Sequence, residues 1–192
     1  FICFGGADAT IVVCDATCLE RSLNLVLQII EMTDRVVVCV NLLDEARKKH
    51  LRIDLSALEQ ELGVPVVGTS ARSRKGLNTL LERTAQVARR EYCGHVIRPH
   101  YTPSIEKALA VIEACLKPLS PEGPSVRWLA VRLLCGDQSA AAQSSAFLGY
   151  PLKQDPAVCD AVARAHVILS ADGIERQKLL DQIAACPVLW AE

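Results

Sequence analysis

Long hydrophobic runs, an excess of one charge and a basic-then-apolar stretch typical of a signal peptide are all missing from this sequence of 192 residues. The longest apolar run, residues 36–43, is interrupted by Asn41 and falls short of the ~18–20 residues that a membrane helix needs. The 21 Lys and Arg residues are balanced by 22 Asp and Glu residues, which gives a net charge of −1. General nucleic-acid binders usually carry a basic excess, so we expect no nucleic-acid partner. The cluster Arg47-Lys48-Lys49 is interpreted as solvated helix surface.

Cysteine spacings typical of metal sites are missing too. The nine cysteines form no C-x-x-C pair, and their odd number argues against a complete disulfide framework. We therefore expect a reducing, cytosolic environment. The closest approach to a metal cluster is Cys93-Gly94-His95 with His100 nearby, which we interpret as a linker with incidental Cys and His. We predict no metal site.

The sequence does contain a repeated alternation of apolar strands and amphipathic helices. Three short runs rich in Val and Ile, at residues 11–14, 36–40 and 64–67, are typical of strands covered on both faces of a parallel sheet. Helical spacing predicts helices over 19–32, from Asp54 or Ser56 to Leu62, and over about 77–91. Ser56 with Glu59 fits a capping box. This order predicts right-handed βαβ crossovers in an α/β unit.

The pattern changes after Glu91. No further strand is predicted, and helices are expected over about 104–116, 126–134, 156–169 and 173–185. A Pro- and Gly-rich stretch at residues 118–124 predicts a break between two of them. We predict an α/β unit over residues 1–91, a linker over 92–103 and a small all-helical domain over 104–192.

Two polar loops follow the second and third predicted strands, where ligands bind in open parallel sheets. The first holds Asn41 and Asp44. A carboxylate presents two acceptor oxygens that match the N1–H and N2–H2 donors of guanine, a pair that adenine does not offer. The second loop, Thr69-Ser70-Ala71, is expected to give a backbone N–H to guanine O6 and a wall for the base. The alternative for Asn41 and Asp44 is a plain helix cap after a strand.

Four stretches carry a resemblance to a known family: "ADATIVVCDATCLERSLNLVLQ", "VVVCVNLLDEARKK", "IDLSALEQELGVPVVGTSARSRKG" and "RWLAVRLLCGD". Together they resemble the cytoplasmic part of the ferrous iron transport protein B family, which are bacterial ferrous-iron permeases with a fused GTPase domain. The guanine motif of general GTPases reads N-K-x-D, and Leu42 stands here at the Lys position, as is typical of this family. The aliphatic stem of that Lys normally packs on the base, so weaker nucleotide affinity is expected.

The resemblance implies a partial P-loop-GTPase-like parallel sheet with flanking helices, followed by the family's helical domain, which favours the GDP-bound state. GTP or GDP is the implied cofactor, bound weakly or not at all, and magnesium is expected only with the missing half of the domain. The implied partners are guanine nucleotide and the rest of the transporter, including its membrane domain, at the cytoplasmic face of the bacterial inner membrane. The implied guanine-binding residues are Asn41, Asp44, Ser70 and Ala71.

Neither a phosphate-binding loop of the form G-x-x-x-x-G-K-[ST] nor a D-x-x-G occurs in the 192 residues. We therefore predict no catalytic residue and no GTP hydrolysis by this chain, which is expected to be a fragment of the permease. A second hypothesis is a nucleotide-free interaction module that docks or self-associates through an open sheet edge. A third, an unrelated α/β enzyme, rests only on Asp15 with Thr17. Asp15, Glu20 and Arg21 are otherwise interpreted as structural.

Overall fold

The computed structural model describes residues 2–92, 94, 96–98, 100–119 and 125–191. Two compact units are present. One consists mainly of residues 6–98, and the other of residues 99–190 together with 3–5. The predicted pair Cys93 and His95, and most of the predicted break at 118–124, lie outside the described residues.

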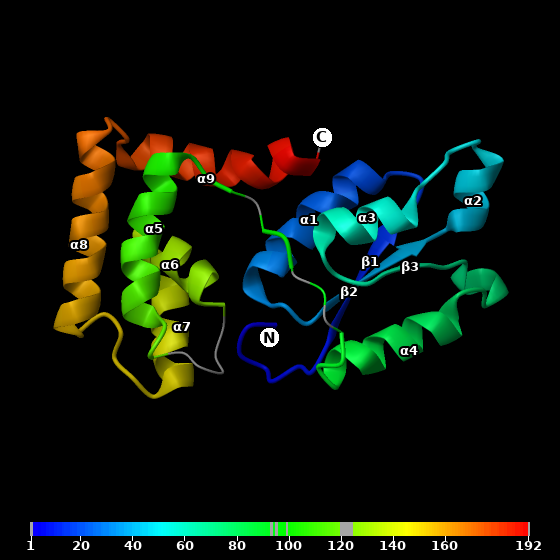
Figure 1. The fold of residues 1–192 in the computed structure, drawn as a ribbon, viewed down its shortest axis with the longest axis horizontal. Helices are drawn as coiled ribbons and strands as arrows, with labels where there is room; N and C mark the ends of the chain where they lie inside the picture. The colour runs from blue at the N-terminus through cyan, green and yellow to red at the C-terminus, as the bar shows by residue number, and fades with distance from the viewer. Residues whose placement is uncertain (1, 93, 95, 99, 120–124, 192) are drawn as a thin grey trace. The chain divides into compact units, whose positions relative to one another are not determined.

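The first unit is a three-layer α/β arrangement around a parallel sheet of three strands in the order β1-β2-β3 (Figure 1). The strands are β1 (Thr10–Asp15), β2 (Val36–Asn41) and β3 (Val66–Gly68). Helices α1 (Leu19–Met32) and α3 (Leu55–Leu62) cover one face, and α4 (Leu77–Ala88) covers the other. The short helix α2 (Leu43–Lys48) follows β2, and the 3₁₀ turn η1 (Ala71–Ser73) follows β3.

The central strand β2 is buried on both faces, as its run of apolar residues predicts. Val36, Val38 and Val40 belong to the core shared with α1 and α3, whereas Val37 packs with Val67 and Val87 on the side of α4. Removing such apolar surface from water stabilises the folded state by a free energy of about 25 cal/mol per Å². Strand β2 therefore anchors both layers and fixes the position of the loop that follows it.

Two local predictions for this unit are wrong in detail. The third strand begins at Val66 rather than at residue 64, because Pro65 has no backbone N–H and joins the sheet only as an acceptor, from the Val38 N–H at 2.9 Å. The capping box of Ser56 and Glu59 does not form. Asp54 caps α3 by accepting from Ser56 N and Ala57 N, and Glu59 Oε2 instead accepts from the Val66 N–H at 3.1 Å.

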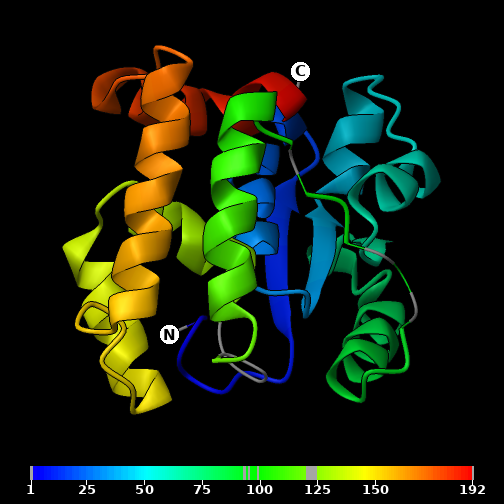
Figure 2. The ribbon, with the colours of Figure 1, turned by 60° about the vertical axis from the view of Figure 1, so that its left-hand side comes forward.

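The second unit is entirely helical among its described residues. It contains α5 (Pro103–Leu116), α6 (Val126–Leu134), α7 (Gln138–Leu148), α8 (Pro156–Ala171) and α9 (Arg176–Ala191). Helices α5 and α8 run side by side (Figure 2). The fully buried side chains at its centre are Ile105, Leu109, Ile112, Leu116, Leu129, Leu134, Leu152, Leu169 and Leu179.

Helix α7 is missing from the sequence predictions. Its residues are mostly Ala, Ser and Gln, so no strong apolar stripe identifies it. Its ends do carry signals: Asp137 accepts from the Ala140 N–H at 3.0 Å, and Gly149 ends the helix with a φ of 62°. Caps alone therefore mark this helix in the sequence.

Candidate functional site

The carboxyl ends of β1 and β2 lie level with each other, which brings the loops after the strands together. Asp15 pairs with Asn41 across β1 and β2, and Val40 pairs with Gly68 across β2 and β3. The Leu43 N–H donates to the Thr69 carbonyl at 3.2 Å. The two polar loops predicted from the sequence are thus neighbours at one edge of the sheet.

Asn41 links these two loops through its side-chain carbonyl. Its Oδ1 accepts from the Thr69 hydroxyl at 3.0 Å and from the Ala71 backbone N–H at 3.1 Å. Because Thr69 Oγ1 donates to Asn41, the Cys39 thiol 3.3 Å away is the donor in its contact with the same hydroxyl. With both acceptor sites of Oδ1 in use, the Asn41 NH2 group is the part of the side chain that can serve a ligand.

Asp44 and Ser70 form the second link between the loops. The Asp44 N–H donates to Ser70 Oγ at 3.2 Å, and Ser70 is 6% exposed. Hydrogen bonding from the Ser70 side chain, helped by nearby backbone N–H groups and by Lys48, holds the pKa of the half-buried Asp44 below its ordinary value. Asp44 is therefore an ionised carboxylate at neutral pH, which offers acceptors only.

The backbone N–H groups of the Thr69–Ala71 loop are all donated within the protein. Thr69 N donates to the Val40 carbonyl at 2.8 Å, Ser70 N to the Lys75 carbonyl at 3.1 Å, and Ala71 N to Asn41 Oδ1. This differs from the expectation that one of them faces guanine O6. Ser70 is buried and holds Asp44, whereas Ala71 is exposed at the edge of the site.

Two glycines, unrecognised in the sequence, allow the loops to approach each other. A Cβ at Gly68 would lie 2.4 Å from Leu43 Cδ1 and 2.6 Å from Leu55 Cδ1. Gly76, with a φ of 79°, has the Gly68 carbonyl oxygen 2.2 Å from the position of its absent Cβ. The sequence signal for Gly76 is its place just before a predicted helix, after a short polar turn.

Leu42, at the position of the GTPase Lys, has a φ of 65° and is 36% exposed. A left-handed conformation costs an L-residue with a large side chain roughly 1–2 kcal/mol, and Asn adopts it more readily. We therefore expect Leu42→Asn to raise the free energy of unfolding of the α/β unit by about 1 kcal/mol in a urea titration. Leu42→Ala keeps the backbone cost and is the matched control; an equal gain in that variant would contradict the explanation.

The lowered pKa of the Asp44 carboxyl predicts how its contribution to stability depends on pH. Its folded-state pKa is depressed, so its contribution to stability is complete above the ordinary Asp pKa and is lost as pH falls through the lower folded value. We expect Ser70→Ala to move the Asp44 titration upward, toward the ordinary value. Carboxyl-carbon NMR titration measures this, with Asp54, which caps a separate helix, as the internal reference. An unchanged Asp44 midpoint in Ser70→Ala would refute the role of the hydroxyl.

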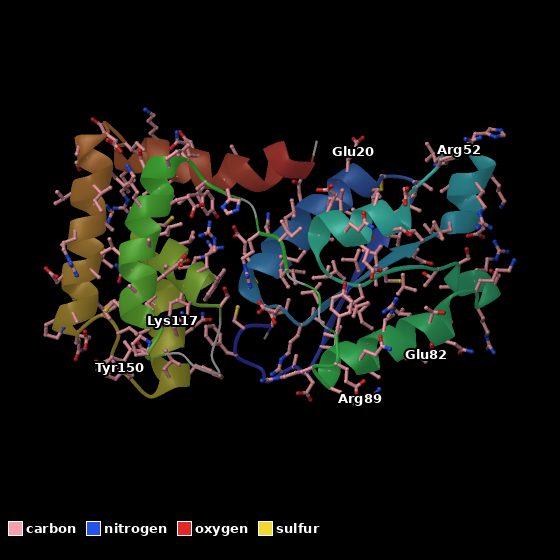
Figure 3. All side chains as sticks on the ribbon, in the orientation of Figure 1. Glu20, Arg52, Glu82, Arg89, Lys117 and Tyr150 are labelled. Carbon is pink, nitrogen blue, oxygen red and sulfur yellow. The ribbon has the colours of Figure 1, made fainter. Side chains whose placement is uncertain are left out.

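Asp15 stabilises the turn after β1. Its Oδ1 accepts from the Thr17 N–H at 2.7 Å, and hydrogen bonding from the Thr17 backbone and side chain lowers its pKa. A carboxylate with a lowered pKa is a weak general base, which disfavours the reading of Asp15 with Thr17 as a catalytic pair. Glu20 and Arg21 are exposed at the start of α1, where Figure 3 shows Glu20 pointing outward.

Neither a metal cluster nor a membrane span is found within the described ranges. No three His, Cys, Asp or Glu side chains there gather as metal ligands. No described helix has both the length and the apolar character to cross a bilayer.

Comparison with known proteins decides the family. The family model described as "Ferrous iron transport protein B" matches residues 1–84, and the model described as "FeoB cytosolic helical domain" matches residues 101–182. This chain belongs to the ferrous iron transport protein B (FeoB) family. The two matches are to successive parts of the same family, a GTPase part and a helical part, and together they account for most of the chain.

Curated FeoB relatives agree with this assignment. The Fe(2+) transporter FeoB of Escherichia coli K12 is 33% identical over 180 residues, which is 88% of this chain and 22% of the relative. That of Salmonella typhimurium is 34% identical over 138 residues, 71% of this chain and 17% of the relative. The chain thus spans about a fifth of the length of these relatives.

Solved FeoB structures have the same fold. The cytosolic domain of the T. maritima FeoB iron transporter in a GDP form is 26% identical, with a TM-score of 0.64 over 96% of this chain and 70% of that one. An S. thermophilus NFeoB variant bound to GDP and aluminium fluoride is 24% identical, with a TM-score of 0.74 over 99% and 69%. The predicted fold class, a parallel GTPase-like sheet followed by a helical region, is confirmed.

Proposed function

We propose that this chain forms the guanine-recognising part of the cytosolic region of a ferrous-iron transporter, in which the bound nucleotide regulates iron uptake. The observation that carries the proposal is the double link between two loops. Asn41 accepts from Thr69 and Ala71, and Asp44 bonds Ser70, so an ionised carboxylate and an amide NH2 are held at one sheet edge. These are the groups that guanine recognition needs.

Each group has a defined role in the proposal. Asp44 accepts from guanine N1–H and N2–H2, and the Asn41 NH2 donates to the O6 and N7 side of the base. Ser70 positions Asp44, and Ala71 borders the base. The 192 residues offer no motif for the phosphates or for magnesium, so GTP or GDP is held through the base and hydrolysis is not expected.

The direct test compares GDP with ADP. We expect the 192-residue chain to bind GDP with a dissociation constant on the order of 1 mM, about 4 kcal/mol, and ADP about tenfold more weakly. Backbone NMR shifts of the loops around Asn41 and Thr69 would follow the titration. Asp44→Ala should remove the GDP response, whereas Glu45→Ala, the adjacent carboxylate, should keep it. Equal responses to GDP and ADP would overturn base recognition.

The proposal also names a protein partner for the chain. The remainder of the transporter, including its membrane domain, is the proposed partner of the helical unit, at the cytoplasmic face of the bacterial inner membrane. The similarity to full transporters over about a fifth of their length supports this.

A second candidate, docking through the sheet, is favoured by the outer strand β1. Within the described residues, β1 pairs only with β2. Ile11 and Val13 of β1 lie on the face of the sheet that α4 covers at β2 and β3, and they are 39% and 62% exposed. We propose that a second copy of the chain adds to this edge when no other strand is available. Analytical ultracentrifugation should then show a dimer that Val13→Lys dissociates; a wild-type monomer would exclude it.

A further inference from the structure

Beyond the proposed guanine loops, the α/β unit carries a cationic surface in the segments that follow β2 and β3. Seven of the 21 Lys and Arg residues lie in two short segments, and all seven are exposed. We call this set the basic surface. It consists of Arg47, Lys48, Lys49 and Arg52 in and after α2, and Arg72, Arg74 and Lys75 in the turn after β3.

The backbone brings the two segments together. The Leu43 N–H donates to Thr69 at 3.2 Å, and the Asp44 N–H donates to Ser70 at 3.2 Å, so α2 and η1 start side by side. Figure 3 shows Arg52 beside α2, with the side chains of the turn after β3 at the same end of the α/β unit. The two cationic segments thus begin next to each other and lie at the same end of the α/β unit.

Few acidic groups neutralise this surface. In the described part of the chain, Lys48 is the one member with an ion pair, to Glu45 Oε1 at 2.8 Å. Asp54 is engaged as the cap of α3, and Asp44 is held by Ser70. Residues 42–54 and 70–76 together hold these seven cations and three carboxylates, which gives a net charge of +4 in a chain whose total is −1. Such an asymmetry is typical of a surface that meets an anionic partner.

We propose that the basic surface docks on the anionic headgroups of a lipid bilayer. Leu51 lies between Lys49 and Arg52 and is 43% exposed, which adds an apolar side chain for the headgroup boundary. No Phe, Tyr or Trp occurs in residues 42–54 or 70–76, so the stacking platforms of nucleic-acid binding are absent from these segments. Clustered Lys and Arg residues on a cytosolic surface suit acidic phospholipids.

The choice of a bilayer over an acidic protein rests on the proposed place of the chain in a membrane transporter. Docking and base recognition use different side chains on the same two loops. The seven cations are exposed, whereas Asn41 accepts from the Thr69 hydroxyl and the buried Ser70 accepts from the Asp44 N–H. A docked basic surface would therefore hold the guanine loops against the membrane without occupying the base site.

Vesicle co-sedimentation of the 192-residue chain tests the proposal. We expect binding to phosphatidylcholine vesicles that contain about a third phosphatidylglycerol, no binding to pure phosphatidylcholine, and loss of binding near 1 M salt, where the Debye length is about 3 Å. Each cation contributes about fivefold, so the triple variant Arg72→Gln/Arg74→Gln/Lys75→Gln should bind roughly a hundredfold more weakly. Circular dichroism establishes that the variant is folded.

The matched control removes three exposed cations elsewhere, in Arg89→Gln/Arg164→Gln/Lys178→Gln, and should change vesicle binding by less than about threefold. An equal loss of vesicle binding in both triple variants would overturn the proposal. Undiminished vesicle binding by the Arg72→Gln/Arg74→Gln/Lys75→Gln variant would overturn it as well. Displacement by soluble polyglutamate at equal charge would assign the surface to an acidic macromolecule instead. If the Arg72→Gln/Arg74→Gln/Lys75→Gln variant lost GDP binding, the cations would bind nucleotide phosphates instead of lipid. If the wild-type chain bound GDP but not the vesicles, the docking proposal would be refuted and the proposal of guanine recognition would stand.

Discussion

Replacing Asp44 by Asn is expected to exchange a preference for GDP for a preference for xanthosine diphosphate. Guanine presents two donors, N1–H and N2–H2, to the two acceptor oxygens of the carboxylate. Xanthine keeps N1–H but carries a carbonyl at position 2. An Asn amide, with one acceptor and one donor, matches that edge and mismatches guanine. The change in shape is small, so the variant alters the hydrogen-bonding pattern rather than the fold.

The expected effect follows from the strength of charge-assisted hydrogen bonds, about 1.5–3 kcal/mol. We expect GDP to bind at least tenfold more weakly and xanthosine diphosphate at least tenfold more tightly, so the ratio of the two affinities should change by about a hundredfold. NMR titrations with both nucleotides measure this ratio, and Glu45→Gln is the control for loss of one negative charge. A variant that lost GDP without gaining xanthosine diphosphate would show that Asp44 does not pair with the base edge.

The second large effect is expected at Gly76. In Gly76→Ala the new methyl carbon would lie 2.2 Å from the Gly68 carbonyl oxygen, and the residue would keep a φ of 79°. Both contributions are unfavourable, because a backbone atom cannot move aside as a side-chain tip can and because Ala disfavours positive φ. We expect the α/β unit to lose about 3 kcal/mol or more of unfolding free energy, measured by denaturant titration.

Gly6→Ala separates the two contributions. Gly6 belongs to the same unit and has a φ of 66°, but nothing lies within 4 Å of the added carbon. This variant should cost no more than about 1 kcal/mol. Because Gly68 leads directly into Thr69, Gly76→Ala should also disturb the loop NMR signals, whereas Gly6→Ala should not. Similar costs at both positions would show that the close approach is relieved elsewhere.

The sequence predicted the strands and the two loops well, because both depend on local patterns. The Val-rich run at β2 has no polar alternation, which is typical of a strand buried on two faces. The similar run at β1 predicted the same burial and was wrong in this respect, because Ile11 and Val13 are exposed on one face. The polar residues Asn41 and Asp44 interrupt that pattern where the second strand ends. The position of a candidate site at the carboxyl edge then follows from parallel topology alone.

Hydrogen-bond partners were less predictable, because they depend on how elements meet in space. Glu59 is placed to close a capping box in the sequence, yet the folded chain directs it to the first residue of β3, seven positions away. A backbone N–H of the loop Thr69-Ser70-Ala71 was expected to face the base, yet all three are donated within the protein, that of Ala71 to Asn41, thirty positions earlier. Side-chain geometry of this kind requires the register of neighbouring strands, which the pattern of one segment does not contain.

The burial of β2 on both faces has a consequence for the alignment of its strand. If β2 slid by one residue, Val would still fill both layers, so its apolar residues scarcely distinguish one alignment from the next. Asn41 does distinguish them: drawn one position inward, it would leave the Thr69 and Ala71 donors and become a buried amide without its partners, at a cost of about 1–3 kcal/mol. The Asn41 side chain, which is proposed to face the base, thus also fixes the register of β2. Any substitution at Asn41 that changes nucleotide specificity therefore has to preserve this register as well.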